Sequence, residues 1–458
     1  MGIQDAIDEV SSFLGQRLGR SKSDLDLHGG SESYFPLTPP DAVAYPDNTE
    51  EVARIIKVCA QHRCPVIGWG TGTSLEGQSQ APEGGLCVDF QRMNRILDVA
   101  NGDMDARVQP GVTREALNTE LRATGLFFPV DPGANASLGG MASTRASGTT
   151  AVKYGTMRDN VLGLEVVTAK GEVVRTGTRA RKSASGYDLT GLFVGSEGTL
   201  GLITELTLRL HGVPEAISAA VCAFDSVNQA VETVMAAVQL GLPVARIELM
   251  DVESVRAVNT YAGSDLSEAP HLLLEFHGSE ASVAEQAQTF GYLVADFDGS
   301  GFQWAAKVED RTALWAMRHN AYHAILATRP GARSLVTDVC VPISRLAEAI
   351  AACRSELQKA AIDGPILGHV GDGNFHACLL FDPENADETA RVIEASERLV
   401  DLALSLGGTA TGEHGIGIGK RKYMQREHGT GWAMMGTIKA ALDPDNIMNP
   451  GKLVPPRN

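Results

Sequence analysis

The chain has 458 residues, of which 43% are hydrophobic and 21% are charged, and its formal net charge is −17. This composition is typical of a folded globular protein, and the length predicts two or three domains. The negative charge argues against nucleic acid or an anionic membrane surface as the main partner.

The cysteines and the N-terminal segment indicate the compartment. The seven cysteines lie singly and show no C-x-x-C or haem-attachment spacing, so we expect a reducing environment. Residues 1–20 have the apolar spacing of an amphipathic helix, but Asp5, Asp8 and Glu9 are atypical of transit or signal peptides. No apolar run approaches the ~20 residues of a membrane span. We predict a protein that is not secreted, either cytoplasmic or peripheral to the inner membrane.

The first part of the chain leads into a glycine-rich segment. A polar link over 21–47 is followed by a helix that opens at 49–51 and by a short buried strand at 64–67. Closely spaced glycines let backbone N–H groups approach an anion such as a pyrophosphate. The candidate residues are Gly68, Gly70, Thr71, Gly72, Thr73 and Ser74. A Rossmann unit would need a helix directly after these residues. The glycines and prolines of 77–85 disfavour such a helix, and this argues against NAD as the cofactor.

Two further glycine-rich segments lie in a strand-rich region. The second one contributes Pro132, Gly133, Ala134, Ser137, Gly139, Gly140, Ala146, Ser147 and Gly148. The third, at 195–201, contributes Gly198 and leads to Ile203 on a strand over 201–208. Small residues at this density let a flat ring and a diphosphate lie against the main chain. The region therefore predicts a site for a large cofactor.

A second domain is predicted after the Gly/Pro cluster at 211–214. Helices are expected at 227–240 and 343–359, and strands at 244–249 and 271–276. This alternation predicts an α+β domain with an antiparallel sheet.

The segment 368–376 predicts a hairpin that carries two histidines. Asp-Gly is a strong signal for a two-residue type I′ turn. With Asp372 and Gly373 at the turn, His369 would directly oppose His376 on one face, close enough for both to bind one metal ion.

The segment 407–415 adds a carboxylate and a third imidazole. Neighbouring residues of an extended chain point to opposite sides, so Glu413 and His414 should not ligate the same ion. We assign His369, His376 and Glu413 as metal ligands, with open positions for a substrate, and His414 as the base.

Four motifs together resemble those of the FAD-dependent D-2-hydroxy-acid dehydrogenases, and most closely the cytochrome-type D-lactate dehydrogenases. They are Thr337–Pro342, Gly368–His376, Gly412–Gly417 and Met448–Gly451. The resemblance implies an α+β protein with a two-part FAD-binding domain of the vanillyl-alcohol oxidase type. It implies domain limits of 1–34 for an N-terminal helix and link, 35–212 for FAD, 213–425 for substrate and metal, and 426–458 for a segment that returns to the FAD domain.

The same resemblance assigns further site residues. It places Arg318 at the substrate carboxylate and Asn449 near the flavin, and it implies zinc or manganese as the metal. No histidine lies in the glycine-rich segments, so we expect non-covalent FAD. The electron acceptor stays open among cytochrome c, a quinone-linked protein, an electron-transfer flavoprotein and oxygen, and a homodimer is one candidate assembly.

The substrate expectation is a small D-2-hydroxy acid, with D-lactate favoured over glycolate and D-2-hydroxyglutarate. Val336 stands where the D-2-hydroxyglutarate subfamily has a lysine, although Arg333 could compensate. From another class, a non-catalytic flavin- and zinc-binding protein would need a fourth protein ligand, for which Cys378 is the nearby candidate.

Overall fold

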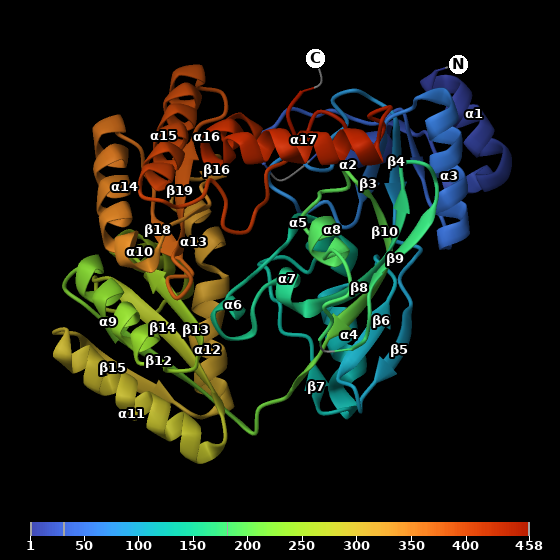
Figure 1. The fold of residues 1–458 in the computed structure, drawn as a ribbon. Helices are drawn as coiled ribbons and strands as arrows, with labels where there is room; N and C mark the ends of the chain where they lie inside the picture. The colour runs from blue at the N-terminus through green and yellow to red at the C-terminus, as the bar shows by residue number, and fades with distance from the viewer. Residues whose placement is uncertain (1, 31–32, 181, 457–458) are drawn as a thin grey trace. The chain divides into compact units, whose positions relative to one another are not determined.

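The computed structural model describes residues 2–30, 33–180 and 182–456 (Figure 1). Its contacts divide the chain into two compact units. Unit 1 comprises Met1–Ser147, Gly155–Val213 and Glu413–Asn458, and unit 2 comprises Gly148–Tyr154 and Pro214–Gly412. Of the predicted terminal segments, residues 1, 31–32 and 457–458 lie outside the described residues.

The first part of unit 1 is a small sheet in the order β1-β2-β4-β3, with β2, β3 and β4 parallel. Its strands are β1 (Leu18–Gly19), β2 (Ala42–Ala44), β3 (Val66–Trp69) and β4 (Leu86–Asp89). Helices α1 (Ile3–Leu14) and α3 (Thr49–His62) pack on it through the apolar positions that the helical spacing predicted. Asn48 caps α3 by accepting a hydrogen bond from the Glu51 amide, which fixes where the helix begins.

The prediction that residues 21–47 form an irregular polar link is wrong. It contains α2 (Lys22–Gly29), whose start is capped by the Ser21 side chain, and the buried strand β2. Both elements are too short for hydrophobic periodicity to reveal them, and β2 is stabilised by parallel pairing with β4 at the other end of a long connection.

The second part of unit 1 is an antiparallel sheet in the order β5-β6-β10-β8-β9 with its own core. Its strands are β5 (Ile96–Ala100), β6 (Asp105–Val108), β8 (Val161–Thr168), β9 (Val173–Gly177) and β10 (Gly201–Arg209), and β7 (Leu126–Phe127) pairs separately with β11 (His211–Gly212). The helices of this part are α4 (Arg114–Glu120), α5 (Leu138–Thr144), α7 (Met157–Asn160) and α8 (Leu189–Phe193). The C-terminal segment adds α16 (Met424–His428) and α17 (Thr430–Leu442) to the unit.

Unit 2 is built on a large antiparallel sheet in the order β15-β12-β14-β13-β18-β19-β16, with β17 also paired to β19. The strands are β12 (Ala216–Ala223), β13 (Val244–Met250), β14 (His271–Gly278), β15 (Ser300–Ala305), β16 (Arg333–Val336), β17 (Val339–Cys340), β18 (Ile366–Gly368) and β19 (Asn374–Phe381). The helices are α6 (Ala151–Tyr154), α9 (Val227–Gln239), α10 (Val252–Ala262), α11 (Glu280–Asp296), α12 (Val308–His319), α13 (Ala321–Ala327), α14 (Leu346–Ala360) and α15 (Ala386–Ser405). The predicted α+β domain with an antiparallel sheet is therefore present.

The two faces of this sheet have different contents. On one face, Phe276 of β14 contacts Phe290 of α11, and α9, α14 and α15 continue the same helical layer (Figure 1). On the other face, Leu273 of β14 packs with residues of α10, α12 and α13. Alternate strand residues point to opposite faces, so this second face also receives Glu248, which pairs directly with Leu273.

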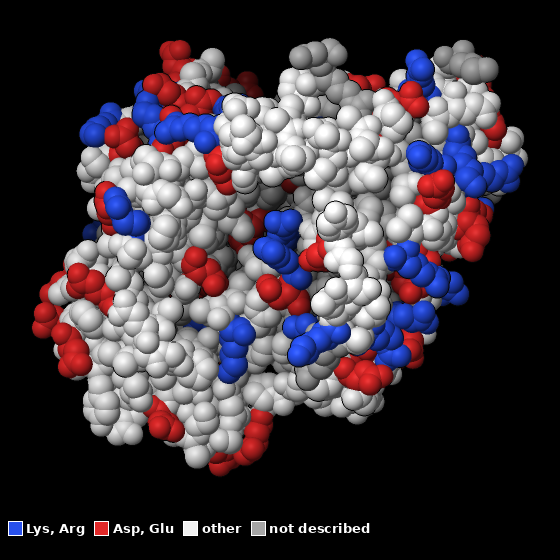
Figure 2. All heavy atoms as spheres, viewed as in Figure 1, with Lys and Arg blue, Asp and Glu red and all other residues white. Residues whose placement is uncertain are grey.

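The distribution of surface charge and the length of the helices relate to the predictions about nucleic-acid and membrane partners. On the face drawn in Figure 2, basic and acidic side chains are interspersed. Within the described ranges, no helix combines the length and the apolar character that crossing a bilayer requires.

Candidate functional site

The first and second glycine-rich segments of unit 1 lie close together at Gly70 and Ser137. A Cβ on Gly70 would lie 2.1 Å from Ser137 Oγ, so glycine at 70 lets the first segment lie against the start of α5. Ser137 is buried, and among the described residues its hydroxyl finds no hydrogen-bond partner. A buried hydroxyl without a partner is costly, and a bound phosphate oxygen or ring nitrogen would supply one. These features fit the predicted cofactor.

The third segment and the C-terminus join the same region. Asn449 is buried and donates through Nδ2 to the carbonyl oxygens of Gln78, 3.0 Å away, and Glu197, 2.6 Å away. The chain beside it forms a parallel bridge between Met448 and Val66 of β3. Asn449 therefore links the loop after the first glycine segment, the 195–201 turn and the C-terminal end.

Other predicted cofactor residues have clear packing roles. A Cβ on Gly139 would meet Pro110 at 2.4 Å, and one on Gly72, at φ +71°, would meet the Trp69 ring at 2.3 Å. Ile203 lies in the core of the second sheet, as does Ala146. These positions shape the segments whether or not they touch a ligand.

The predicted hairpin is present, but its register is wrong by two residues. Strand β18 pairs with β19 so that Leu367, not His369, opposes His376. The connection is longer than two residues because Val370 is buried and the Asp372 and Asn374 amides both donate to the His369 carbonyl. Gly373 has φ +80°, but Asp372 does not have the positive φ that a type I′ turn requires.

The two histidines still lie on one face, because a shift of two residues preserves the side to which each side chain points. Their ring centroids are 5.4 Å apart with the planes at 82°. They are diagonal neighbours on the face of the sheet that carries Glu248. The segment therefore brings two imidazoles together, as predicted, but the strand pairing that does so differs from the predicted one.

Each imidazole is oriented by a partner at Nδ1. His369 Nδ1 lies 2.6 Å from Glu248 Oε1, and His376 Nδ1 lies 2.9 Å from the Thr337 carbonyl oxygen. Both partners accept hydrogen bonds, so Nδ1 carries the proton and, in the neutral ring, the lone pair is on Nε2. Both histidines are thus held in a form that suits metal binding through Nε2.

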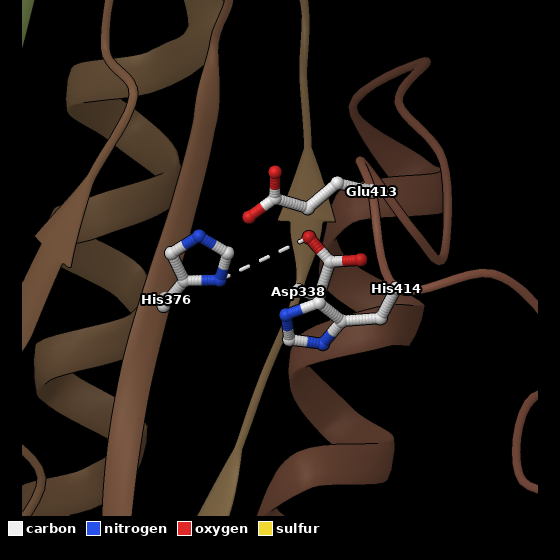
Figure 3. Close-up of side chains that lie close together, drawn as sticks. All are labelled: Asp338, His376, Glu413 and His414. Atoms are coloured by element: carbon white, nitrogen blue, oxygen red, sulfur yellow. Dashed lines mark ion pairs between the residues drawn. The ribbon is translucent and has the colours of Figure 1, made fainter. Parts of the chain in front are cut away.

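The remaining predicted residues lie in a bend directly after Gly412, the last residue of unit 2. Glu413 and His414 were expected to point to opposite sides, and this expectation is wrong. The chain bends over 412–414 and is not extended, and Gly415 has φ +82°. Potential ligand atoms of Asp338, His376, Glu413 and His414 all lie within 4.8 Å of one another. Figure 3 shows these four side chains close together.

Asp338 is the member of this group to which sequence reasoning gave no role. It is buried, and its two carboxylate oxygens accept hydrogen bonds from Asn374 Nδ2, 2.9 Å away, and Thr411 Oγ1, 2.6 Å away. Its Oδ1 is 3.9 Å from His376 Nδ1, the ring nitrogen that already faces the protein. The signal was its place in the Thr337–Pro342 motif, but no spacing rule connects that motif with residue 376.

The donor set fits a divalent cation. Imidazole and carboxylate groups gathered at this distance match the ligand preferences of zinc and manganese. His369 is adjacent to the group of four but not within it. Cys378 does not supply a further ligand, because burial raises the pKa of its thiol to about 12 and it packs in the apolar core.

Arg318 lies on α12, and its guanidinium contacts the Glu248 carboxylate. Its Nε and one terminal nitrogen lie 2.9 Å and 2.7 Å from Glu248 Oε2. Burial raises the pKa of the Glu248 carboxyl, but His369 and Arg318 outweigh burial, so this pKa lies below its ordinary value. One edge of the guanidinium is therefore occupied by a protein carboxylate in this structure.

Hydrogen bonds within unit 1 connect the glycine-rich segments to the segment that carries Glu413 and His414. The Ser147 hydroxyl, at the end of the second glycine-rich segment, donates to Glu413 Oε2 at 3.0 Å. Glu197, in the third segment, accepts from the amides of Ile416 and Gly417. The bend that carries Glu413 and His414 is thereby fixed to the glycine-rich region.

Comparison with known proteins places these features in a family. The model of the FAD binding domain matches residues 40–177, and the model of the C-terminal domain of FAD linked oxidases matches residues 213–453. The chain belongs to the FAD-linked oxidases. The family predicted from the motifs is confirmed, and the protein is an FAD-dependent oxidoreductase.

Two named relatives match nearly the whole chain. The Danio rerio protein called "Probable D-lactate dehydrogenase, mitochondrial" is 51% identical over 94% of this chain and 87% of its own length. "D-lactate dehydrogenase [cytochrome], mitochondrial" of Arabidopsis thaliana is 44% identical over 99% of this chain and 80% of its own.

The fold of this oxidase is also shared with a solved structure. The chain matches p-cresol methylhydroxylase with substrate bound at a TM-score of 0.82, over 98% of this chain and 96% of that one, with 19% identity. The fold is that of the vanillyl-alcohol oxidase-type flavoproteins, as predicted.

Proposed function

We propose that the protein oxidises a small D-2-hydroxy acid, D-lactate first among them, to the 2-oxo acid. The observation that carries this proposal is the group of Asp338, His376, Glu413 and His414, tied through Glu413 to a glycine-rich segment of the FAD-binding domain. The names of the relatives from Danio rerio and Arabidopsis thaliana support D-lactate.

Each group has an assigned task. When bound, FAD supplies a hydride acceptor at N5, and a zinc or manganese ion supplies a positive charge for the substrate oxygens. His369, His376 and Glu413 would hold the ion, with Asp338 supporting the bend through Thr411. His414 takes the proton of the substrate hydroxyl, since imidazole titrates near neutral pH. Arg318 faces the substrate carboxylate with the edge that Glu248 does not use.

The size of the substrate is argued from β16. Val336 packs against the apolar core of unit 2, so position 336 supplies no cation of its own to a second substrate carboxylate. Arg333 lies three positions earlier on the same strand, so its side chain projects to the opposite face and does not replace a lysine at 336. This favours lactate or glycolate over D-2-hydroxyglutarate.

The flavin is proposed to be non-covalent. His28, whose ring centroid is 4.7 Å from that of Trp69 beside the first glycine segment, has its ring nitrogens placed against the Asp24 carbonyl and Asp89. An acid-precipitated sample should release its flavin into the supernatant. Flavin that stays with the pellet would contradict this assignment.

The acceptor and the compartment complete the proposal. Cytochrome c is the acceptor we favour, because the Arabidopsis thaliana relative carries the word cytochrome in its name. All seven cysteines are free thiols, which supports a reducing compartment.

An anaerobic titration tests the function. The flavin absorbance should bleach with D-lactate, and much less with L-lactate or D-2-hydroxyglutarate. Bleaching by D-2-hydroxyglutarate alone would overturn the substrate assignment, and a spectrum unchanged by every 2-hydroxy acid would favour a non-catalytic binding protein. Reduction of added cytochrome c by the D-lactate-reduced enzyme tests the acceptor.

A further inference from the structure

Glu248 is a fully buried carboxylate that contacts two residues of the proposed site. It lies on β13 and is 0% exposed. Oε1 faces His369 Nδ1 and Oε2 faces the guanidinium of Arg318. Because β13 fixes the position of this carboxylate, the single side chain of Glu248 determines where the His369 imidazole and the Arg318 guanidinium lie.

We propose that Glu248 is a positioning residue that fixes His369 as a metal ligand and aligns Arg318 beside it. This inference rests on the proposed function, since it takes His369 to be a ligand. It adds a residue that neither the motifs nor the group of four potential ligands contains.

The argument begins with the tautomer of His369. A carboxylate 2.6 Å from Nδ1 accepts a hydrogen bond from it, so the metal-binding lone pair is placed on Nε2. The same contact fixes the rotation of the ring, which stands at 82° to the His376 ring. Without it, the imidazole can rotate or adopt the other tautomer, and its lone pair no longer points consistently in one direction.

The second step concerns Arg318. A guanidinium that is largely buried on α12 needs a counter-ion, and Glu248 provides one through two hydrogen bonds to the same oxygen. The pair also fixes α12 against the face of the sheet that carries the histidines. Glu248 thus couples the geometry of the metal ligand to that of the residue assigned to the substrate carboxylate.

A purely structural explanation must be separated from this one, and the molecule offers a matched control. Glu275, on the adjacent strand β14 and on the same face, is also buried between a histidine and an arginine. Its Oε1 lies 2.7 Å from His277 Nε2, and its Oε2 lies 3.5 Å from Arg246. His277 is not among the metal ligands predicted or found. Loss of either carboxylate should lower the stability of the fold to a similar extent, but only loss of the Glu248 carboxylate should change the metal site.

The experiment compares Glu248→Gln with Glu275→Gln in the full-length holoenzyme. Zinc affinity is measured by competition with a chromophoric chelator, and the thermal midpoint is recorded for both variants. We expect Glu248→Gln to weaken zinc binding by about 10–100-fold, the usual effect of removing such a partner. Glu275→Gln should stay within about twofold of the parent protein, although its thermal midpoint falls.

Two further variants make every outcome decisive. His369→Ala should abolish tight zinc binding; if it does not, the proposed metal site fails, and not merely the role of Glu248. If His369→Ala loses zinc while Glu248→Gln retains parent affinity, the positioning role is overturned. Should Glu248→Gln not fold, Glu248→Gln combined with Arg318→Met removes the unpaired buried charge. Parent zinc affinity in that folded double variant would also overturn the proposal.

Discussion

The glycine-rich region of unit 1 and the histidine-bearing face of unit 2 are built in different ways. In the first, the proposed cofactor contacts depend on the backbone and on positions without side chains, as where Gly70 lies against Ser137. In the second, it depends on side chains projecting from one sheet face, each with a partner that fixes its direction, as Glu248 does for His369. A backbone site tolerates substitutions until a new atom fills it, whereas a side-chain site fails when a single donor is removed.

The largest expected effect comes from removing a donor on the sheet face. His376→Ala should lower turnover with D-lactate by about 10⁴-fold, because a metal ion contributes several kcal/mol of charge stabilisation. Bound metal, measured by elemental analysis, should fall with it, and the flavin spectrum should stay unchanged. A variant that keeps both metal and turnover would remove His376 from the site and end the contrast between the regions.

The next effect tests chemistry against binding within the same face. His414→Ala should lower turnover by about 10³-fold, in the usual range for loss of a general base. Metal and flavin contents should both stay near those of the parent protein, since the base is not an assigned ligand. Near-normal turnover with metal and flavin in place would show that another group takes the proton.

A smaller effect is expected in the glycine-rich region. Gly70→Ala places a Cβ where Ser137 Oγ now lies, and overpacking of this kind costs about 1–3 kcal/mol. We expect FAD affinity, measured by flavin fluorescence, to fall by about tenfold, with zinc affinity unchanged.

Gly212→Ala is the control for this substitution. A Cβ there meets no atom within 4 Å, so FAD affinity should not change. An equal loss in both variants would mean that the effect is not local to the contact between Gly70 and Ser137.

The same contrast explains what sequence could predict. Helix α3 and strand β3 were predicted because local periodicity and turn residues determine them. The pair of histidines was predicted from one turn, although the register was off by two. The error arose because Val370 is buried and a Cβ on Gly373 would lie 2.1 Å from the Val341 carbonyl oxygen. Val341 directly follows β17, which pairs with β19, so this constraint comes from outside the hairpin.

The residues that sequence missed act through long-range contacts. Glu248 and His369 are separated by 121 positions, and Asp338 reaches Thr411 across 73. No local pattern encodes such a pair. Sheet pairing brings Glu248 to the correct face, and that pairing is a property of the folded unit. The bend at 412–414 was missed for a similar reason, because its conformation depends on contacts to Glu197 and Gln78.

The last effect is on stability alone and concerns a buried lysine beside the glycine-rich region. Lys452 is 1% exposed and donates to the Gln80 carbonyl and to Asn449 Oδ1. Burial lowers its pKa to about 7 in the folded protein, from an ordinary value of 10.5. The unfolded chain therefore binds more protons than the folded one between these two values, so this group makes the free energy of unfolding rise with pH from about 7 to 10.

Lys452→Met removes that contribution. Relative to the variant, the parent protein should gain about 1–3 kcal/mol of unfolding free energy between pH 7 and pH 9.5. Urea unfolding at the two pH values, with FAD in excess, measures the difference. Because only the change with pH is compared, packing differences between lysine and methionine cancel. Parallel stability curves would show that Lys452 stays charged when buried, so that its contacts with backbone and amide oxygens compensate fully for its lost hydration.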